Sequence, residues 1–168
     1  MLDRALGKQY VPDAGRAYLL KLRGHAFYVF GHLDRAERDL EEAAALVPND
    51  AGIIGLQARV WAAKKENLDE AYRYAISLIK TFPGNVENWN ILALVVRAQE
   101  GWEPALEILN RVGRVAEECS ELFLQLGDLR MKTGDRTGAA EAYRKAIALS
   151  EDGLIIRAEA ERKLRRAK

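Results

Sequence analysis

Apolar residues recur at intervals of three and four along almost the whole chain, which is the spacing of an amphipathic helix. No stretch shows the clean alternation of apolar and polar residues that predicts a half-buried strand. Two of the prolines, Pro48 and Pro83, follow helical stretches, where proline often ends a helix. The pattern therefore predicts an all-α protein made of short helices with short connections.

The helical pattern itself returns at a period close to 34 residues. Residues 126–149 (LGDLRMKTGDRTGAAEAYRKAIAL) align with residues 23–46, 57–79 and 92–115, and the second copy carries one extra residue that we place at 64–67. Small residues occupy two matching positions, first Gly24, Ala58, Ala93 and Gly127, then Ala36, Ala71, Ala105 and Ala139. Helices approach closely only where the facing side chains are small, so each copy is predicted to be a packed helix pair.

Glycines have further expected places within a copy. Gly31 and Gly134 are expected to turn the chain between the two helices, because glycine readily takes a left-handed conformation. Gly138 is expected to be exposed, and the pattern gives it no clear role.

This pattern resembles the tetratricopeptide repeat, a pair of antiparallel helices in each 34 residues. Val112 and Gln57 depart from the family pattern, and the last two copies lack its proline. The resemblance implies an α-α superhelix, or solenoid, in which neighbouring pairs share a continuous core. The expected organisation is an N-terminal segment or partial helix (1–16), four repeats (17–50, 51–85, 86–119 and 120–153) and a capping helix with a basic tail (154–168).

Both ends of the array carry further helical spacing. Leu2, Leu6 and Tyr10 could cover the first repeat, or be the remnant of a preceding repeat in a longer array. In the last helix, Leu154, Ala158 and Leu164 are expected to pack on the fourth repeat. Its cations are expected to face water: Arg157, Arg162, Lys163, Arg165, Arg166 and Lys168. A basic tail that binds nucleic acid or acidic lipid is the less favoured alternative.

Charge and composition narrow the class of protein. Lys and Arg number 26 against 25 Asp and Glu, and this balance argues against nucleic acid as the main partner. The N-terminus lacks the apolar core of a signal peptide, and no apolar run is long enough to span a membrane. A single cysteine, Cys119, cannot form an internal disulfide. We therefore expect a cytoplasmic protein, or a soluble fragment of a larger one, without membrane insertion.

Candidate chemistry is sparse in this sequence. His25 and His32 belong to no cluster with the spacing of metal ligands, and no phosphate-binding loop or nucleophile elbow is present. Cys119 lies just before a helix, where a thiolate could be stabilised, but neither histidine is near it in sequence. We expect no enzyme, no cofactor and no metal, and the reactivity of the Cys119 thiol near neutral pH would test this.

The resemblance implies that the first helices of the repeats line a concave groove. The side chains expected there include Tyr18, Lys21, Leu22, His25, Tyr28, Leu56, Arg59, Asn90, Ile91, Leu94, Arg97 and Asp128, with Met131 and Lys132 in the fourth repeat. The carboxylate clamp by which some family members hold chaperone C-termini is not expected. Only Lys21 matches it, and Glu87 reverses a charge.

The groove residues suggest a protein partner. Small residues of the second repeat should form a depression flanked by Arg59 and Arg97, and Glu87, Glu121 and Asp128 make the far end acidic. The sequence therefore predicts a non-enzymatic scaffold or adaptor that binds a peptide or helix here, with an apolar anchor in the depression and an acidic group near the arginines. The pattern does not name the partner.

Three alternatives remain open. The groove charges could pair with one another or with the N-terminal segment, so that the partner binds elsewhere. The solenoid ends could stack into a self-assembling scaffold. The chain could also be a small chaperone for a secreted or membrane-system protein.

Overall fold

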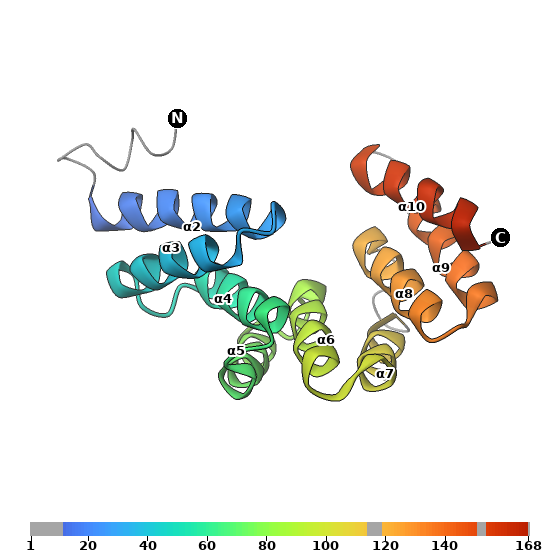
Figure 1. The fold of residues 1–168 in the computed structure, drawn as a ribbon, viewed down its shortest axis with the longest axis horizontal. Coiled ribbons are helices and arrows are strands. Elements are labelled where there is room, and N and C mark those ends of the chain that lie inside the picture. Colours follow the sequence, from blue (N-terminus) through green and yellow to red (C-terminus); the bar gives the residue numbers. More distant parts are fainter. Residues whose placement is uncertain (1–11, 114–118, 151–153, 168) are drawn as a thin grey trace. The chain divides into compact units, whose positions relative to one another are not determined.

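The computed structural model describes residues 12–113, 119–150 and 154–167, and every regular element in these ranges is an α-helix (Figure 1). Leu2, Leu6 and Tyr10 lie outside the described residues. The helices are α2 (Asp13–Val29), α3 (Leu33–Leu46), α4 (Ala51–Lys64), α5 (Leu68–Thr81), α6 (Val86–Glu100), α7 (Trp102–Gly113), α8 (Ser120–Lys132), α9 (Arg136–Ala148) and α10 (Leu154–Ala167). The predicted all-α fold class is confirmed.

The chain forms two compact units, Met1–Thr81 and Phe82–Lys168. In the first unit, α2 packs on α3, α3 on α4, and α4 on α5. In the second unit, α6 packs on α7, α7 on α8, α8 on α9, and α10 on both α9 and α8. Contacts that run mainly between successive helices are the pattern of a helical repeat protein.

The first helix begins earlier than the repeat pattern suggested. Helix α2 starts at Asp13, ahead of the boundary expected at residue 17, and the Arg16 N–H already donates to the Pro12 carbonyl. Proline fixes its own φ near the helical value, and an acidic residue in the first turn suits the helix dipole, so Pro12 and Asp13 favour this earlier start.

Small residues set the distance between paired helices. A Cβ added to Gly127 on α8 would lie 2.4 Å from the ring of Tyr143 on α9. A Cβ added to Gly24 on α2 would lie 3.0 Å from Leu40 Cγ on α3. Both distances are shorter than an ordinary contact, so a larger residue at this repeat position would push the second helix away.

The glycines of the turn regions have distinct roles. Gly31 and Gly134 have φ values of 79° and 86°, the left-handed conformation predicted for them. The expectation for Gly138 was wrong, because this residue is buried. Its N–H donates to Asp135 Oδ1 at 2.8 Å, and its carbonyl accepts from Arg130 Nη1 at 2.9 Å. Gly138 therefore belongs to the N-terminal cap of α9.

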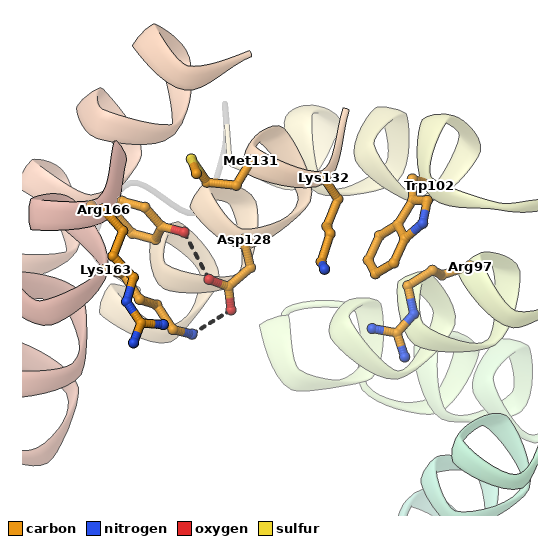
Figure 2. A pocket seen from close by; sticks show the side chains of 8 residues that line it. Arg97, Trp102, Asp128, Met131, Lys132, Lys163 and Arg166 are labelled. Atoms are coloured by element: carbon orange, nitrogen blue, oxygen red, sulfur yellow. Dashed lines mark hydrogen bonds and ion pairs between the residues drawn. The ribbon is translucent and has the colours of Figure 1, made fainter. Parts of the chain in front are cut away.

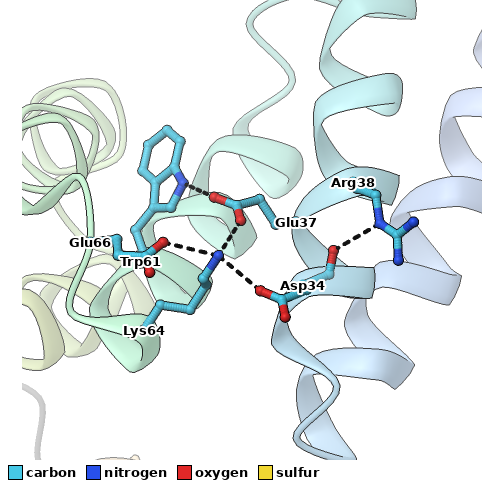
Figure 3. Close-up of polar contacts among 6 residues, drawn as sticks. All are labelled: Asp34, Glu37, Arg38, Trp61, Lys64 and Glu66. Atoms are coloured by element: carbon cyan, nitrogen blue, oxygen red, sulfur yellow. Dashed lines mark hydrogen bonds and ion pairs between the residues drawn. The ribbon is translucent and has the colours of Figure 1, made fainter.

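A polar cluster at the end of α4 joins it to α3 (Figure 3). Lys64 Nζ lies 2.5 Å from Glu37, 3.0 Å from Asp34 and 2.9 Å from Glu66. The Trp61 indole N–H donates to the other oxygen of Glu37 at 2.8 Å. The Glu37 hydrogen bond is the largest reason that the pKa of Lys64 lies above its ordinary value. The cluster therefore links the first two helix pairs.

The turn that follows Lys64 is where the sequence placed its extra residue. Lys65 and Asn67 both have positive φ, at 60° and 48°. Left-handed backbone at two residues without glycine reverses the chain before α5 begins at Leu68.

Helix α10 packs on the second unit through Leu164, as expected, but not through Ala158. Ala160 and Ala167 are buried and Leu164 packs against the core, whereas Ala158 is exposed. The expectation for Ala158 was therefore wrong. Residues 160, 164 and 167 are spaced by four and three, so they form one helical stripe, and Ala158 lies off it.

Candidate protein-binding surfaces

One side of α2 carries exposed apolar and aromatic side chains. Tyr18, Leu22 and Val29 are 56%, 38% and 65% exposed, and His25 is exposed between them. Their spacings of four, three and four residues place them on one face of the helix. We call these four residues the α2 face. Tyr18, Leu22 and His25 were among the predicted groove residues.

The other predicted residues of the first unit have partners within it. Lys21 Nζ lies 3.4 Å from Asp50 Oδ1, and Leu56 is half-buried against the core of the unit. Tyr28 and Arg59 share a hydrogen bond. Burial lowers the pKa of the Arg59 guanidinium, while the Tyr28 hydroxyl acts in the opposite direction. The structure therefore brings Tyr28 and Arg59 together.

Two predicted residues of the second unit are not on an open surface. Asn90 and Ile91 are 0% and 3% exposed, and Asn90 Nδ2 donates to Glu87 at 3.3 Å. The expectation that they line a groove was wrong. Most residues of α6 from Asn88 to Val96 are buried, as expected for a helical stretch that is apolar on most sides. Leu94 is half-buried on the same helix.

Arg97 and Asp128 meet at a pocket of about 470 Å³ within the second unit (Figure 2). Each of the five helices from α6 to α10 contributes to it. The lining side chains are Arg97, Trp102, Asp128, Met131, Lys132, Tyr143, Lys163 and Arg166. In Figure 2, Lys163 and Arg166 lie on one side of Asp128, and Lys132, Trp102 and Arg97 on the other.

Asp128 is held by two donors in this pocket. The Tyr143 hydroxyl donates to Oδ1 at 2.9 Å, and Lys163 Nζ donates to Oδ2 at 2.5 Å. Lys163 also lies 2.7 Å from Glu159. Burial first, and then Asp128, raises the pKa of the Tyr143 hydroxyl, so the phenol keeps its proton and acts as a donor. The expectation that Lys163 faces water was wrong, because its ammonium turns back onto α8.

Two cations lie close to the Trp102 ring. Arg97 Cζ is 5.1 Å and Lys132 Nζ is 5.8 Å from the ring centroid, within the range of cation–π attraction. Among the residues that the structure describes, Arg97, Lys132 and Arg166 have no carboxylate partner. The pocket therefore offers cations that no carboxylate of the described residues neutralises.

Sequence reasoning missed four of the pocket residues. Trp102 and Tyr143 are in the second helices of their repeats, and Lys163 and Arg166 are in α10. The repeat pattern assigned groove positions to first helices alone. Two features of the sequence pointed to these residues. One is the excess of cations over carboxylates near the C-terminus, and the other is the tryptophan directly after Gly101.

Neither a metal-binding cluster nor a membrane-spanning helix is found among the described residues. Within the described ranges, no group of three or more His, Cys, Asp or Glu side chains is placed to hold a metal ion. In the same ranges, no helix combines the length and the apolar character that crossing a membrane requires.

Comparison with known proteins gives distant similarities. No family model matches the chain. Over 149 residues it is 26% identical to human Protein O-mannosyl-transferase TMTC1, a match that covers 86% of this chain. The chain spans 17% of the length of that relative.

Solved structures resemble this one more closely in fold. TTC0263, a thermophilic tetratricopeptide-repeat protein of Thermus thermophilus, has a TM-score of 0.70 at 23% identity, over 88% of this chain and 80% of its own. A chain of the APC/C hetero-tetramer Cut9–Hcn1 has a TM-score of 0.61 at 15% identity, over 90% of this chain and 30% of its own. The chain therefore has the fold of tetratricopeptide-repeat proteins, as its sequence predicted.

Proposed function

We propose that this protein is a non-enzymatic scaffold that binds a peptide or helix of a partner protein along exposed faces of its first helices. The observation that carries the proposal is the α2 face. Tyr18, Leu22 and Val29 are large side chains left exposed on one side of a helix whose other side is buried. Contiguous exposed apolar surface of this kind marks interaction sites.

The chemistry of the α2 face fits a protein partner. Tyrosine buries a large area and keeps a polar hydroxyl, which is why it is common at interfaces. Among proteins of this fold, Cut9–Hcn1 is a hetero-tetramer, so the fold supports protein assembly in at least that case. The proposal takes nothing from the transferase activity in the name of TMTC1, because the match spans 17% of that protein. A cytoplasmic setting stays a prediction from the sequence.

Affinity capture with the purified chain, followed by mass spectrometry, tests the α2 face. We expect the double variant Tyr18→Ala with Leu22→Ala to lose the proteins that the wild type retains. Tyr72→Ala is the matched control, because Tyr72 is 41% exposed but lies on α5, a second helix. Circular dichroism would show that each variant is folded. Capture that survives the α2 substitutions and is lost with Tyr72→Ala would place the contact on the second helices instead.

The predicted arginine pair can be tested in the same assay. Arg59 lies in the first unit beside Tyr28, and Arg97 lies in the second unit beside Trp102. Charge reversal of both arginines should abolish partner capture if an acidic group of the partner binds near them. Unchanged capture would place the acidic group elsewhere.

A further inference from the structure

We propose that the pocket of the second unit is a recognition site for an acidic peptide segment, whose carboxylates pair with Lys132, Arg166 and Arg97 while an apolar side chain contacts Trp102. This rests on the proposed function, because it names the chemistry of the partner that the scaffold binds.

The charges that line the pocket do not balance. Four cations line it, Arg97, Lys132, Lys163 and Arg166, against the single carboxylate of Asp128. Lys163 is already neutralised, since it contacts both Asp128 and Glu159. The other three cations have no carboxylate partner among the described residues. A ligand that brings carboxylates would form charge-assisted hydrogen bonds with them, which are stronger than neutral ones.

The apolar side chains of the pocket favour a ligand that also carries an apolar group. Trp102 and Met131 are both half-buried lining residues, and each packs against the core of the unit. Tryptophan, methionine and arginine are enriched at the centres of protein interfaces. Arg97 and Lys132 contact the Trp102 ring through cation–π attraction, which leaves their N–H donors available. An aliphatic side chain on the ring, with acidic residues beside it, satisfies both parts of the pocket.

A hydrogen-bonded ion pair holds α10 against α8 and α9 on one side of the pocket. Asp128 on α8 accepts from Tyr143 on α9 and from Lys163 on α10, so one carboxylate joins three helices. Arg166 follows Lys163 by three residues and therefore lies on the same side of α10. A preorganised site loses less conformational entropy on binding than a mobile one.

The geometry favours a peptide over nucleic acid. Nucleic acid binding needs basic residues that follow a phosphate backbone over several contacts. Outside the pocket, Arg157 pairs with Glu161 and Arg162 lies 4.0 Å from Glu159, so these two cations of α10 already have carboxylate partners. The whole chain has a net charge of only +1. A short acidic segment therefore fits this site better than an extended polyanion.

Fluorescence anisotropy with the full chain tests the proposal. The probe is a short fluorescein-labelled peptide rich in glutamate with one central leucine. Its counterparts replace the leucine by serine or the glutamates by lysine, and an oligothymidylate of equal charge is the nucleic-acid arm. We expect the acidic leucine peptide to bind best, the serine version to bind more weakly, and the lysine version not to bind.

Substitutions then locate the binding site. Lys132→Glu with Arg166→Glu should weaken binding of the acidic peptide by about tenfold or more. The matched control is Arg136→Glu with Arg144→Glu, an equal change of charge at exposed positions of α9 outside the pocket, which should bind as the wild type does. Lys132→Gln with Arg166→Gln avoids new repulsion and should also weaken binding. Thermal unfolding would confirm that all three variants are folded.

Several results would overturn the proposal. One is a wild type that does not bind the acidic peptide, and another is a pocket variant that binds it unchanged. Oligothymidylate that binds as tightly as the peptide, with the same dependence on Lys132 and Arg166, would make the pocket a nucleic-acid site. If the pocket proposal fails while the Tyr18 and Leu22 variant still loses partner capture, the proposed scaffold function stands. If the pocket binds acidic peptide while partner capture is independent of the α2 face, that part of the scaffold proposal fails instead.

Discussion

Gly127 shows how the absence of one carbon atom lets two helices pack. The Tyr143 ring occupies the space where its Cβ would be, and the same tyrosine donates to Asp128 one residue along α8. Packing of α8 on α9 and the geometry of the pocket therefore depend on the same contact. A substitution at Gly127 is therefore expected to disturb both the packing of α8 on α9 and the geometry of the pocket.

Gly127→Ala should destabilise the protein by about 1–3 kcal/mol, the usual cost of forcing an extra carbon into a packed core. The helix propensity of alanine offsets about 1 kcal/mol at most. Chemical denaturation would measure the loss. Gly113→Ala is the control, because a Cβ there would lie 3.9 Å from its nearest neighbours, an ordinary contact. Equal effects of the two substitutions would contradict this account.

The Asp50 carboxylate stabilises the start of α4 by accepting hydrogen bonds. It caps α4 by accepting from Ile53 N at 2.9 Å, and Lys21 lies beside it. Partial burial alone would raise the pKa of Asp50, but the Ile53 N–H and the Lys21 ammonium outweigh it, so the pKa lies below its ordinary 3.8. The ionised form therefore stabilises the fold. That contribution is complete above the ordinary value and is lost as the pH falls through the lower, folded-state pKa.

Asp50→Ala should cost about 1 kcal/mol of unfolding free energy at neutral pH, as expected for loss of an N-cap. Asp50→Asn should keep most of it, because asparagine also caps helices. Denaturation at several pH values would show the gap between wild type and Asp50→Ala narrowing in acid. A gap that widens in acid would mean that the carboxylate is not the stabilising form.

At the scale of elements, α10 has its own buried stripe and, among the described residues, an ion pair to the repeat it covers. Ala160, Leu164 and Ala167 face the core of the second unit, and Lys163 reaches Asp128 on α8. Both the packing and the ion pair hold the helix in place. An apolar stripe of small residues gives only modest burial, so the ion pair is expected to matter for how firmly α10 docks.

Lys163→Met should destabilise the docking of α10 by about 1 kcal/mol, since Asp128 is partly exposed and solvent screens the pair. Native-state hydrogen exchange would show faster exchange of α10 amides. Arg157→Met is the matched control on the same helix, because Arg157 pairs only with Glu161 within α10 among the partners seen in the described chain. Faster exchange in the control but not in Lys163→Met would disprove the link.

At the scale of the whole molecule, the same ion pair bears on self-assembly. A head-to-tail scaffold driven by charge would need the acidic fourth repeat of one copy to attract the basic last helix of another. Asp128 and Lys163 already satisfy each other within one chain. Light scattering over a range of concentrations should therefore give the mass of a single chain, and a mass that rises at low salt would support the assembly instead.

The periodicity of the sequence was enough to predict helix pairs, because small residues recur at matching positions and are buried in each copy. The candidate site was harder to predict. Asn90 and Ile91 were predicted to line the groove because of their positions in the family repeat, although the apolar residues around them already favoured burial. Ala158 and Ala160 both have helical spacing, and a small alanine gives little sign of which face it belongs to. The pocket combines five helices, so no single stretch of sequence contains its pattern.

The position of Trp102 also makes its intrinsic fluorescence a probe of the pocket. Indole emission responds to nearby charge, and this indole has a guanidinium and an ammonium close to its ring. The other two indoles are tied elsewhere, since Trp61 donates to Glu37 and Trp89 to the Pro83 carbonyl. With phenylalanine at positions 61 and 89, tryptophan fluorescence would come from Trp102 alone. The wavelength of its emission maximum would then change with the charge state of the pocket, without any attached dye.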